Sequence, residues 1–256
     1  MKFSKLYLLL IFSFLYIPIV VLISLSFNKS GMPTSWGGFS FEWYIKLFEN
    51  QKIFKALINT LIVATISTVI ASILGTLLAV GIEVKKKKNY LIEGTVFIPM
   101  IIPDIVMAIS LLSFFTLIKF TLGLHSIIIG HVVFNIAFVC AVVRTRFNHF
   151  DHNIIEASYD LGGKNVITFI KITLPIIFPG VLAGSLLAFT LSVDEYIIAF
   201  FTAGAGSSST TLPMLIYSMI RFGVTPEINA LSTFIILFSF IILFTSQRFN
   251  KGNVIL

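Results

Sequence analysis

The sequence predicts an all-α membrane protein, with six transmembrane helices in a single domain that covers residues 1–256. Three observations support this prediction. Hydrophobic residues make up 57% of the chain, charged residues make up only 11%, and the mean hydropathy is +1.01. Soluble domains carry about 25% charged residues, so this chain has too few to cover itself in water. Apolar stretches of roughly 20 residues recur without an alternating strand pattern, and such stretches cross a bilayer as helices.

The six predicted spans lie near residues 6–27, 56–82, 95–118, 126–143, 178–201 and 228–246. At a rise of about 1.5 Å per residue, each span reaches about 27 Å or more, enough for a hydrocarbon core with flanking anchors. The first span could instead be a signal peptide, because Met1–Lys5 is basic and Ser24-Leu25-Ser26 resembles a cleavage site. Its apolar core exceeds the usual length of about 7–15 residues, so a retained helix is the prediction.

The positions of lysine and arginine predict that both termini face the cytoplasm. With the N-terminus inside, twelve of the 18 basic residues are cytoplasmic: Lys2, Lys5, Lys85–Lys88, Arg144, Arg146, Lys164, Lys171, Arg248 and Lys251. The other six are external: Lys29, Lys46, Lys52, Lys55, Lys119 and Arg221. Cytoplasmic loops of membrane proteins carry such an excess. The net charge of +7 therefore reflects topology, and nucleic acid is not an expected partner.

Small and aromatic residues predict how the spans pack. Two series of small residues fall on single helix faces, where they let helices approach closely: Ala64, Thr68, Ala71, Gly75 and Ala79, and Gly180, Gly184 and Ala188. Outside the membrane, an amphipathic helix is predicted from the spacing of Phe41, Tyr44, Ile45 and Phe48, flanked by Trp36 and Trp43. Two interpretations of this helix stay open, an interfacial anchor or a docking surface.

The stretch "EASYDLGGKNVITFIKITLP", from Glu156 to Pro175, is the most polar long loop in the chain. Residues 153–161 are predicted to form a short helix, with Asp151 or Asn153 as its cap. Gly162 and the glycine after it are expected to end that helix, because glycine adopts the left-handed conformation at little steric cost.

A second helical pattern follows over residues 165–173. Pro175 and Pro179 are expected to close it, because proline removes a hydrogen bond from a helix interior. The prediction is a stiff helix–turn–helix on the cytoplasmic side, joined directly to the fifth span. A stiff element in that position is suited to receiving force from another protein.

Several kinds of chemistry are absent from the sequence. Neither His-Glu-x-x-His nor Gly-x-Ser-x-Gly occurs, and the nucleotide-binding loop Gly-x-x-x-x-Gly-Lys-Ser/Thr is missing. His149 and His152 have a spacing that can bind metal, but with no third ligand nearby a solvated surface is the better interpretation. The single cysteine, Cys140, excludes an intrachain disulfide. No enzyme activity, metal or cofactor is therefore expected, and any energy for work must come from an ion gradient or a partner.

The polar stretch resembles the EAA signature of the permease subunits of ATP-binding-cassette importers. That signature is Glu-Ala-Ala, three residues, Gly, nine residues and Ile-x-Leu-Pro, and both spacings are met here with Ser158 as the one departure. The resemblance implies a type I importer permease in a bacterial inner membrane, whose coupling helix docks on a cytoplasmic ATPase dimer. It assigns the ATPase contact to Glu156, Ala157, Ser158, Asp160, Gly162, Ile172, Leu174 and Pro175.

Other stretches extend the resemblance over most of residues 36–245. "SVDEYIIAFFTAG" and "TLPMLIYSMIRFGVTPEINALST" are similar to the second permease subunit of spermidine/putrescine importers. The resemblance implies a second permease subunit in a heterodimer and an external substrate-binding protein as further partners.

Acidic residues within the predicted spans are the candidate contacts for a cargo. Helical rise places Asp104 roughly 16 Å past Glu93, near mid-membrane, and it places Asp194 and Glu195 in the outer half of the fifth span. A carboxylate at a span centre costs about 2.5–3.5 kcal/mol on insertion scales, so such residues usually face a bundle interior or an aqueous path. The candidate substrate pathway is therefore Asp104, Asp194, Glu195, Tyr196 and Tyr217, with the tyrosines adding cation–π attraction for ammonium groups.

Alternatives stay open at this point. The acids could pair with Lys119, with Arg221 or with a partner subunit. A kink at Pro99 and Pro103 in the third span could open space for cargo or could serve packing alone. The cargo could also be iron or another small solute. From a different class, the chain could be an assembly subunit of a membrane complex, although such a subunit has no need for a rigid cytoplasmic helix–turn–helix.

Overall fold

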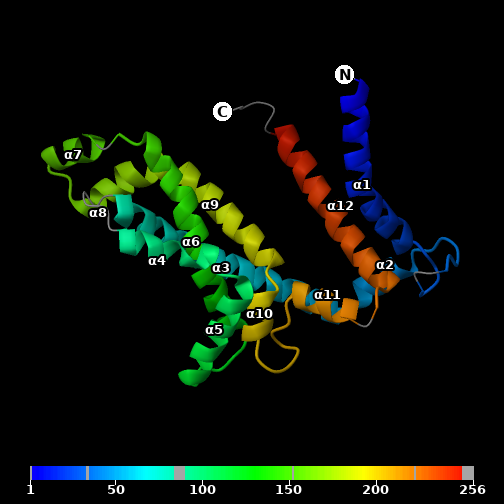
Figure 1. Cartoon of the computed structure of the whole chain (residues 1–256). Helices are drawn as coiled ribbons and strands as arrows, with labels where there is room; N and C mark the ends of the chain where they lie inside the picture. Colours follow the sequence, from blue (N-terminus) through cyan, green and yellow to red (C-terminus); the bar gives the residue numbers. More distant parts are fainter. Residues whose placement is uncertain (1, 33–34, 84–89, 152, 222, 250–256) are drawn as a thin grey trace. The chain divides into compact units, whose positions relative to one another are not determined.

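The structure is a computed structural model that describes residues 2–32, 35–83, 90–151, 153–221 and 223–249 (Figure 1). Every regular element in these ranges is a helix, as the sequence predicts. The chain divides into two compact units. Unit 1 is Met1–Lys55 with Leu215–Leu256, and unit 2 is Ala56–Met214. The Lys85–Lys88 run, His152, Lys251 and the C-terminus lie outside the described residues, as do the side chains of Lys2, His149 and Arg248.

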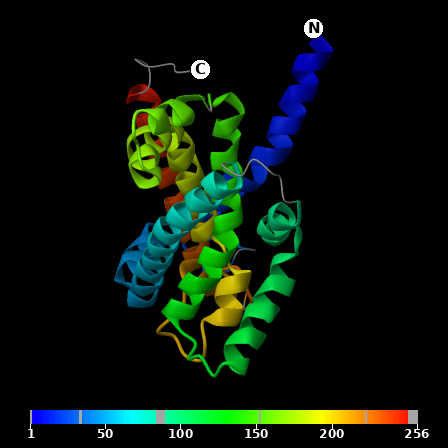
Figure 2. The same cartoon turned by 90° about the vertical axis from the view of Figure 1, so that its left-hand side faces the viewer.

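Three helices of unit 1 pack together: α1 (Lys2–Ser26), α2 (Glu42–Glu49) and α12 (Pro226–Phe249). The first and last of these run antiparallel, so the start of α1 and the end of α12 lie at the same end of the unit (Figures 1 and 2). None of the apolar length of α1 is buried within the chain. Such a surface is suited to lipid or to another apolar chain.

The segment between α1 and α2 is organised by the buried side chain of Asn28. Its Oδ1 accepts hydrogen bonds from the backbone N–H groups of Ser30 at 3.1 Å and Gly37 at 2.8 Å. The Asn28 carbonyl accepts a 2.8 Å hydrogen bond from the indole N–H of Trp43, which ties this loop to α2. The predicted amphipathic helix is confirmed as α2, which buries Leu47, leaves Ile45 and Phe48 exposed, and has Trp43 and Tyr44 half-buried.

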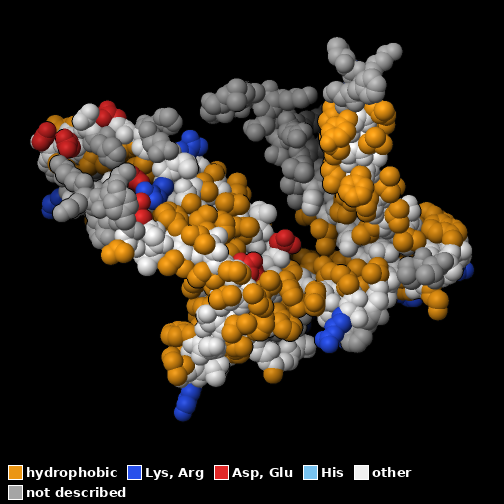
Figure 3. Space-filling view, viewed as in Figure 1, with side chains coloured by type: hydrophobic (Ala, Val, Ile, Leu, Met, Phe, Trp, Pro, Cys, Tyr) orange, Lys and Arg blue, Asp and Glu red, His pale blue; other side chains and the backbone are white. Residues whose placement is uncertain are grey.

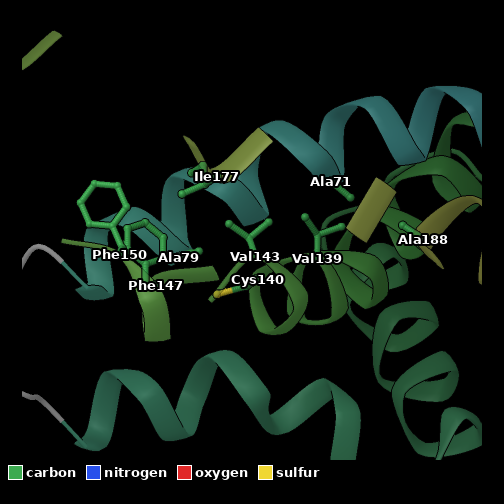
Figure 4. Packing of buried hydrophobic residues seen from close by; sticks show 9 residues of the cluster. All are labelled: Ala71, Ala79, Val139, Cys140, Val143, Phe147, Phe150, Ile177 and Ala188. Carbon is green, nitrogen blue, oxygen red and sulfur yellow. The ribbon is translucent and has the colours of Figure 1, made fainter. Parts of the chain in front are cut away.

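The core of unit 2 forms where three long helices meet: α3 (Gln51–Glu83), α6 (Leu124–Arg144) and α9 (Leu174–Asp194) (Figure 4). Its buried members are Ala71, Ala79, Val139, Cys140, Val143, Phe147, Phe150, Ile177 and Ala188. Many are small, because two neighbouring helices approach α6 closely. A Cβ on Gly75 would lie 2.8 Å from the Val139 Cβ, and one on Gly184 would lie 3.4 Å from the Val139 Cα. These contacts confirm the prediction that both small-residue series mark helix contacts.

Four helices among the described residues are long and apolar enough to cross a membrane by themselves: Lys5–Ser26, Gln51–Glu83, Leu124–Phe147 and Asn165–Asp194. A bent pair, Glu93–Ile101 with Asp104–Leu117, raises the number to five when it is taken as one span. The sixth predicted span falls on α12, where the described side chains end at Ile241. Six spans with cytoplasmic termini therefore stay a prediction.

The third predicted span is two helices, α4 (Tyr90–Ile101) and α5 (Asp104–Leu117), bent by 109° at the break between them. Pro103 supplies the break because proline cannot donate the backbone hydrogen bond that would continue α4. The expected kink is confirmed. The depth of about 16 Å assigned to Asp104 assumed an unbroken helix from Glu93, and the break before Asp104 removes that assumption.

The fifth predicted span is also broken, near its end. α9 stops at Asp194, and after Glu195 and Tyr196 the chain enters α10 (Ile197–Thr202). A loop then leads to α11 (Leu212–Arg221), and residues of α3 hold it in place. The amide of Asn59 donates to the carbonyls of Ser208 and Thr210, each at 2.9 Å. The predicted helix through residue 201 is thus corrected to two helices with the adjacent acids at their junction.

Candidate functional site

The polar stretch forms a compact helical element at one end of unit 2, with α5 toward the opposite end (Figures 1 and 2). Its first helix, α7 (Asn153–Asp160), starts as predicted, because Asp151 Oδ1 accepts a 3.0 Å hydrogen bond from the Asn153 N–H. Acidic side chains gather over the end that carries α7, whereas apolar side chains cover much of the drawn face of the long helices (Figure 3). α7 buries none of its residues.

The turn after α7 has the hydrogen bonds of a Schellman motif. The Gly162 N–H donates to the Tyr159 carbonyl at 2.9 Å, and the Gly163 N–H donates to the Ser158 carbonyl at 2.8 Å. Gly162 has a φ of 84°, the left-handed conformation that glycine favours. A 2.8 Å hydrogen bond between the hydroxyls of Ser158 and Thr168 joins the two arms. The predicted glycine stop is confirmed.

The second arm continues into the long helix of unit 2. α8 (Asn165–Thr168) leads through a π-helical turn, Phe169–Thr173, directly into α9. The prediction that Pro175 and Pro179 close this helix is wrong, because helical structure runs through both. Pro175 directly follows the π-helical turn, and local π adjustments of this kind let membrane helices accommodate proline. Pro179 lies inside α9.

The predicted coupling residues divide into exposed and packed groups. The exposed members are Glu156, Ala157, Asp160, Gly162 and Pro175, whereas Ser158, Ile172 and Leu174 are half-buried. Leu161 is 90% exposed and gives this surface an apolar centre. Ile155, Leu174 and the buried Phe150 pack on the core of unit 2, which holds the element against the bundle.

A charged cluster lies where α6 ends. Arg144 Nε lies 2.8 Å from Glu83 Oε1, and its NH2 group lies 3.3 Å from Glu93 Oε2. The guanidinium also lies over the Phe97 ring, 5.6 Å from its centroid. Arg144 therefore joins the end of α6 to the end of α3 and the first turn of α4. The sequence predicted only that Arg144 is one of the cytoplasmic basic residues.

The structure brings the acids of the predicted pathway to two helix starts that pack on each other. Asp104 is the first residue of α5, and Glu195 lies just before α10. Met107 and Ala108 of α5 form a buried cluster with Ile198 of α10. Non-helical backbone within a membrane occurs where protein buries it or where it lines an aqueous cavity. Two breaks at acidic residues in one region are thus a candidate site for a cation.

The members of the predicted pathway differ in their surroundings. Asp104 and Asp194 are exposed, whereas the Glu195 side chain is only 7% exposed. Among the described residues of unit 2, neither exposed acid forms an ion pair with Lys119. The ring of Tyr196 packs 5.5 Å from that of Phe200. Tyr217 lies on α11 in unit 1, with its side chain exposed.

Sequence reasoning missed one functional candidate, His131. It is 1% exposed on α6, and its Nε2 lies 3.3 Å from Glu195 Oε2. Its Nδ1 lies 2.6 Å from the Ser192 hydroxyl. The signal available in the sequence was an ionisable residue inside an apolar span, a feature that marks functional positions in membrane helices.

Comparisons with known proteins bear on both parts of this site. Residues 71–251 match the family described as "Binding-protein-dependent transport system inner membrane component". The spermidine/putrescine transport system permease protein PotC of Haemophilus influenzae is 38% identical over 248 residues, covering 96% of each chain. PotC of Escherichia coli K12 is 39% identical, covering 95% of this chain and 93% of that protein. The putrescine transport system permease protein PotI of Escherichia coli K12 is 40% identical, covering 90% and 84%.

Solved structures share the fold. A chain of a bacterial ABC transporter involved in the import of the acidic polysaccharide alginate aligns with a TM-score of 0.77 at 16% identity, covering 96% of this chain and 95% of that one. A chain of the MetNI methionine ABC transporter aligns with a TM-score of 0.60 at 19% identity, covering 79% and 94%. At these identities the likeness concerns the fold alone.

Proposed function

Because this chain belongs to the family of inner-membrane components of binding-protein-dependent transport systems, we propose that it is the permease subunit of a polyamine importer. In this proposal all 256 residues form one transmembrane domain with six spans and cytoplasmic termini. The domain provides half of the pathway for spermidine or putrescine. The assignment of a polyamine cargo rests on the sequence identity of 38–40% to PotC and PotI over nearly the whole chain.

The coupling part of the proposal rests on the continuous helix from Asn165 to Asp194. We propose that α7 and the turn at Gly162 dock on a separate ABC ATPase dimer. A displacement of this element would pass into α9 without a flexible joint, because α8 and the π-helical turn connect them. The chain itself would hydrolyse no ATP, since its sequence has no nucleotide-binding loop.

The cargo part rests on the acids at the two helix breaks. Polyamines carry several ammonium groups, and exposed carboxylates at Asp104 and Asp194 offer opposite charge to them. Tyr196 and Tyr217 would add cation–π attraction of about 0.5–2 kcal/mol each where their ring faces meet ammonium groups. A second permease subunit would supply the other half of the pathway, and an external binding protein would deliver the cargo.

A reconstitution experiment tests this function. The chain is placed in proteoliposomes with its cognate ATPase, second permease and binding protein, and uptake of labelled spermidine and putrescine is measured. We expect uptake that requires ATP and all four components, with competition between the two polyamines and none from iron. Uptake by this chain without an ATPase would overturn the coupling, and preferential uptake of iron or another solute would overturn the cargo.

A further inference from the structure

The two adjacent acids at the end of α9 have opposite environments. Asp194 is the last residue of α9 and its side chain is exposed, whereas the Glu195 side chain is almost fully buried. Glu195 Oε1 accepts a 2.7 Å hydrogen bond from the Ile198 N–H, and Oε2 accepts one of 2.9 Å from the Ala199 N–H. N–H groups in the first turn of a helix have no acceptor within that helix, and the Glu195 carboxylate supplies one for these two. Glu195 therefore caps α10 with both carboxylate oxygens.

His131 closes the other side of this carboxylate. Its Nε2 is 3.3 Å from Glu195 Oε2, an electrostatic contact without hydrogen-bond geometry. The other ring nitrogen lies 2.6 Å from the Ser192 hydroxyl, which lies 3.1 Å from the hydroxyl of Ser67. The network thus joins α3, α6 and α9 to the start of α10.

The network lies where α10 is tightly fitted against α6. A Cβ on Gly130 would lie 2.7 Å from the Ile198 Cγ2, so α6 approaches α10 closely beside the Glu195 cap. At the far end of α10, the Ser126 hydroxyl donates a 2.7 Å hydrogen bond to the Thr202 carbonyl. Both ends of α10 are therefore held by α6. The direction in which the chain leaves α9 at Asp194 depends on this fit.

We propose that Glu195 is a positioning residue and that Asp194 is the acid that meets cargo. Glu195, His131 and Ser192 fix the break between α9 and α10, and this break holds the Asp194 carboxylate at the surface of the pathway. The Glu195 carboxylate already accepts hydrogen bonds from two backbone N–H groups, and the His131 ring lies against it. Asp194 keeps its charge available for a cation. The cargo part of this inference rests on the proposed function, whereas the positioning of residue 194 does not.

A double-mutant cycle in the four-component complex separates positioning from direct contact. We expect Glu195→Gln and His131→Asn each to lower ATP-dependent uptake about tenfold, and the double variant to fall no further, because residues of one network are not additive. Asp194→Asn should by itself lower uptake at least as far, and adding His131→Asn to it should cause little further loss, because His131 acts on uptake through the position of residue 194. Additive losses for Glu195 and His131, or an unaltered rate for His131→Asn, would overturn the positioning role.

A second measurement needs no cargo. Asp194→Cys is introduced together with Cys140→Ala, and its alkylation rate is measured in the assembled complex. We expect His131→Asn and the milder Ser192→Ala each to change this alkylation rate about tenfold relative to the protein with the intact network. A change of this size matches the interaction free energy between residues in direct contact. Ser72→Ala is the matched control. It removes a 2.7 Å hydrogen bond between the hydroxyls of Ser72 on α3 and Ser185 on α9, the same two helices that the Ser67–Ser192 contact joins.

The two measurements distinguish the possible failures. An alkylation rate that His131→Asn and Ser192→Ala leave unchanged refutes the inference, whatever the cargo. A changed rate in a complex that carries another solute supports the positioning role and refutes only polyamine cargo. If His131→Asn prevents assembly, which size-exclusion chromatography detects, Ser192→Ala alone decides the outcome.

Discussion

Replacing Gly163 by alanine is expected to loosen the coupling element while its contact residues stay in place. A Cβ at this position would lie 2.7 Å from the Ser158 carbonyl and 2.5 Å from its hydroxyl. The hydroxyl can rotate away, but the carbonyl is held as the acceptor of the Gly163 N–H. The turn must therefore open.

The magnitude of this loosening follows from the contacts that are lost. The hydrogen bond between Ser158 and Thr168 contributes about 1 kcal/mol, and forced overpacking costs about 1–3 kcal/mol. Because α7 buries no residue of its own, few contacts offset this loss. Even about 2 kcal/mol changes the ratio of ordered to open element by about 30-fold.

Two assays detect the opened element. Trypsin should cleave after the exposed Lys164 at least about tenfold faster in Gly163→Ala than in the parent, consistent with local opening that costs less free energy. Proteoliposomes containing the complete transporter should hydrolyse more ATP for each polyamine taken up. The matched control is Gly81→Ala on α3, where an added Cβ meets no atom within 4 Å. Parental cleavage and coupling in Gly163→Ala would refute the proposed stiffness.

Three further predictions concern other parts of the molecule. Glu156→Ala should weaken ATPase binding or uncouple hydrolysis from uptake while the chain stays folded; co-purification tests this, and unchanged transport argues against docking. Gly75→Val should destabilise unit 2 by about 1–3 kcal/mol, because its side chain meets Val139; a parental thermal midpoint would show that α3 and α6 do not approach there. Arg144→Met should leave two carboxylates without their ion-pair partner and lower thermal stability by about 1–3 kcal/mol. An unchanged midpoint would mean that the cluster with Arg144 holds α3 and α4 only weakly.

Local sequence predicted the elements whose cause is local. Gly162 ends α7 because a left-handed residue is needed there, and Asp151 caps the helix through its own side chain. Glycine and alanine series predicted which faces of α3 and α9 pack against another helix, because close approach requires small side chains; the structure shows that this helix is α6. The EAA spacing likewise predicted which residues form the proposed coupling element before any packing was considered.

Features that depend on distant residues could not be predicted. Neither proline nor glycine marks the break after Asp194; it exists because Glu195 satisfies the N–H groups of α10 while His131 faces the same carboxylate. Pro175 was expected to end a helix, a rule that holds in isolated segments. Here a π-helical turn and the packing of Leu174 on the core carry the helix through the proline.

The central claim is that α7 receives force from a separate ATPase on the cytoplasmic side. Site-specific cross-linking tests it most directly, with a photoreactive residue at position 156 in the working four-component complex. The account predicts a cross-link to the ATPase that changes in yield during hydrolysis. A complex that transports normally without any such cross-link, or a position 156 labelled only from outside the membrane, would contradict it.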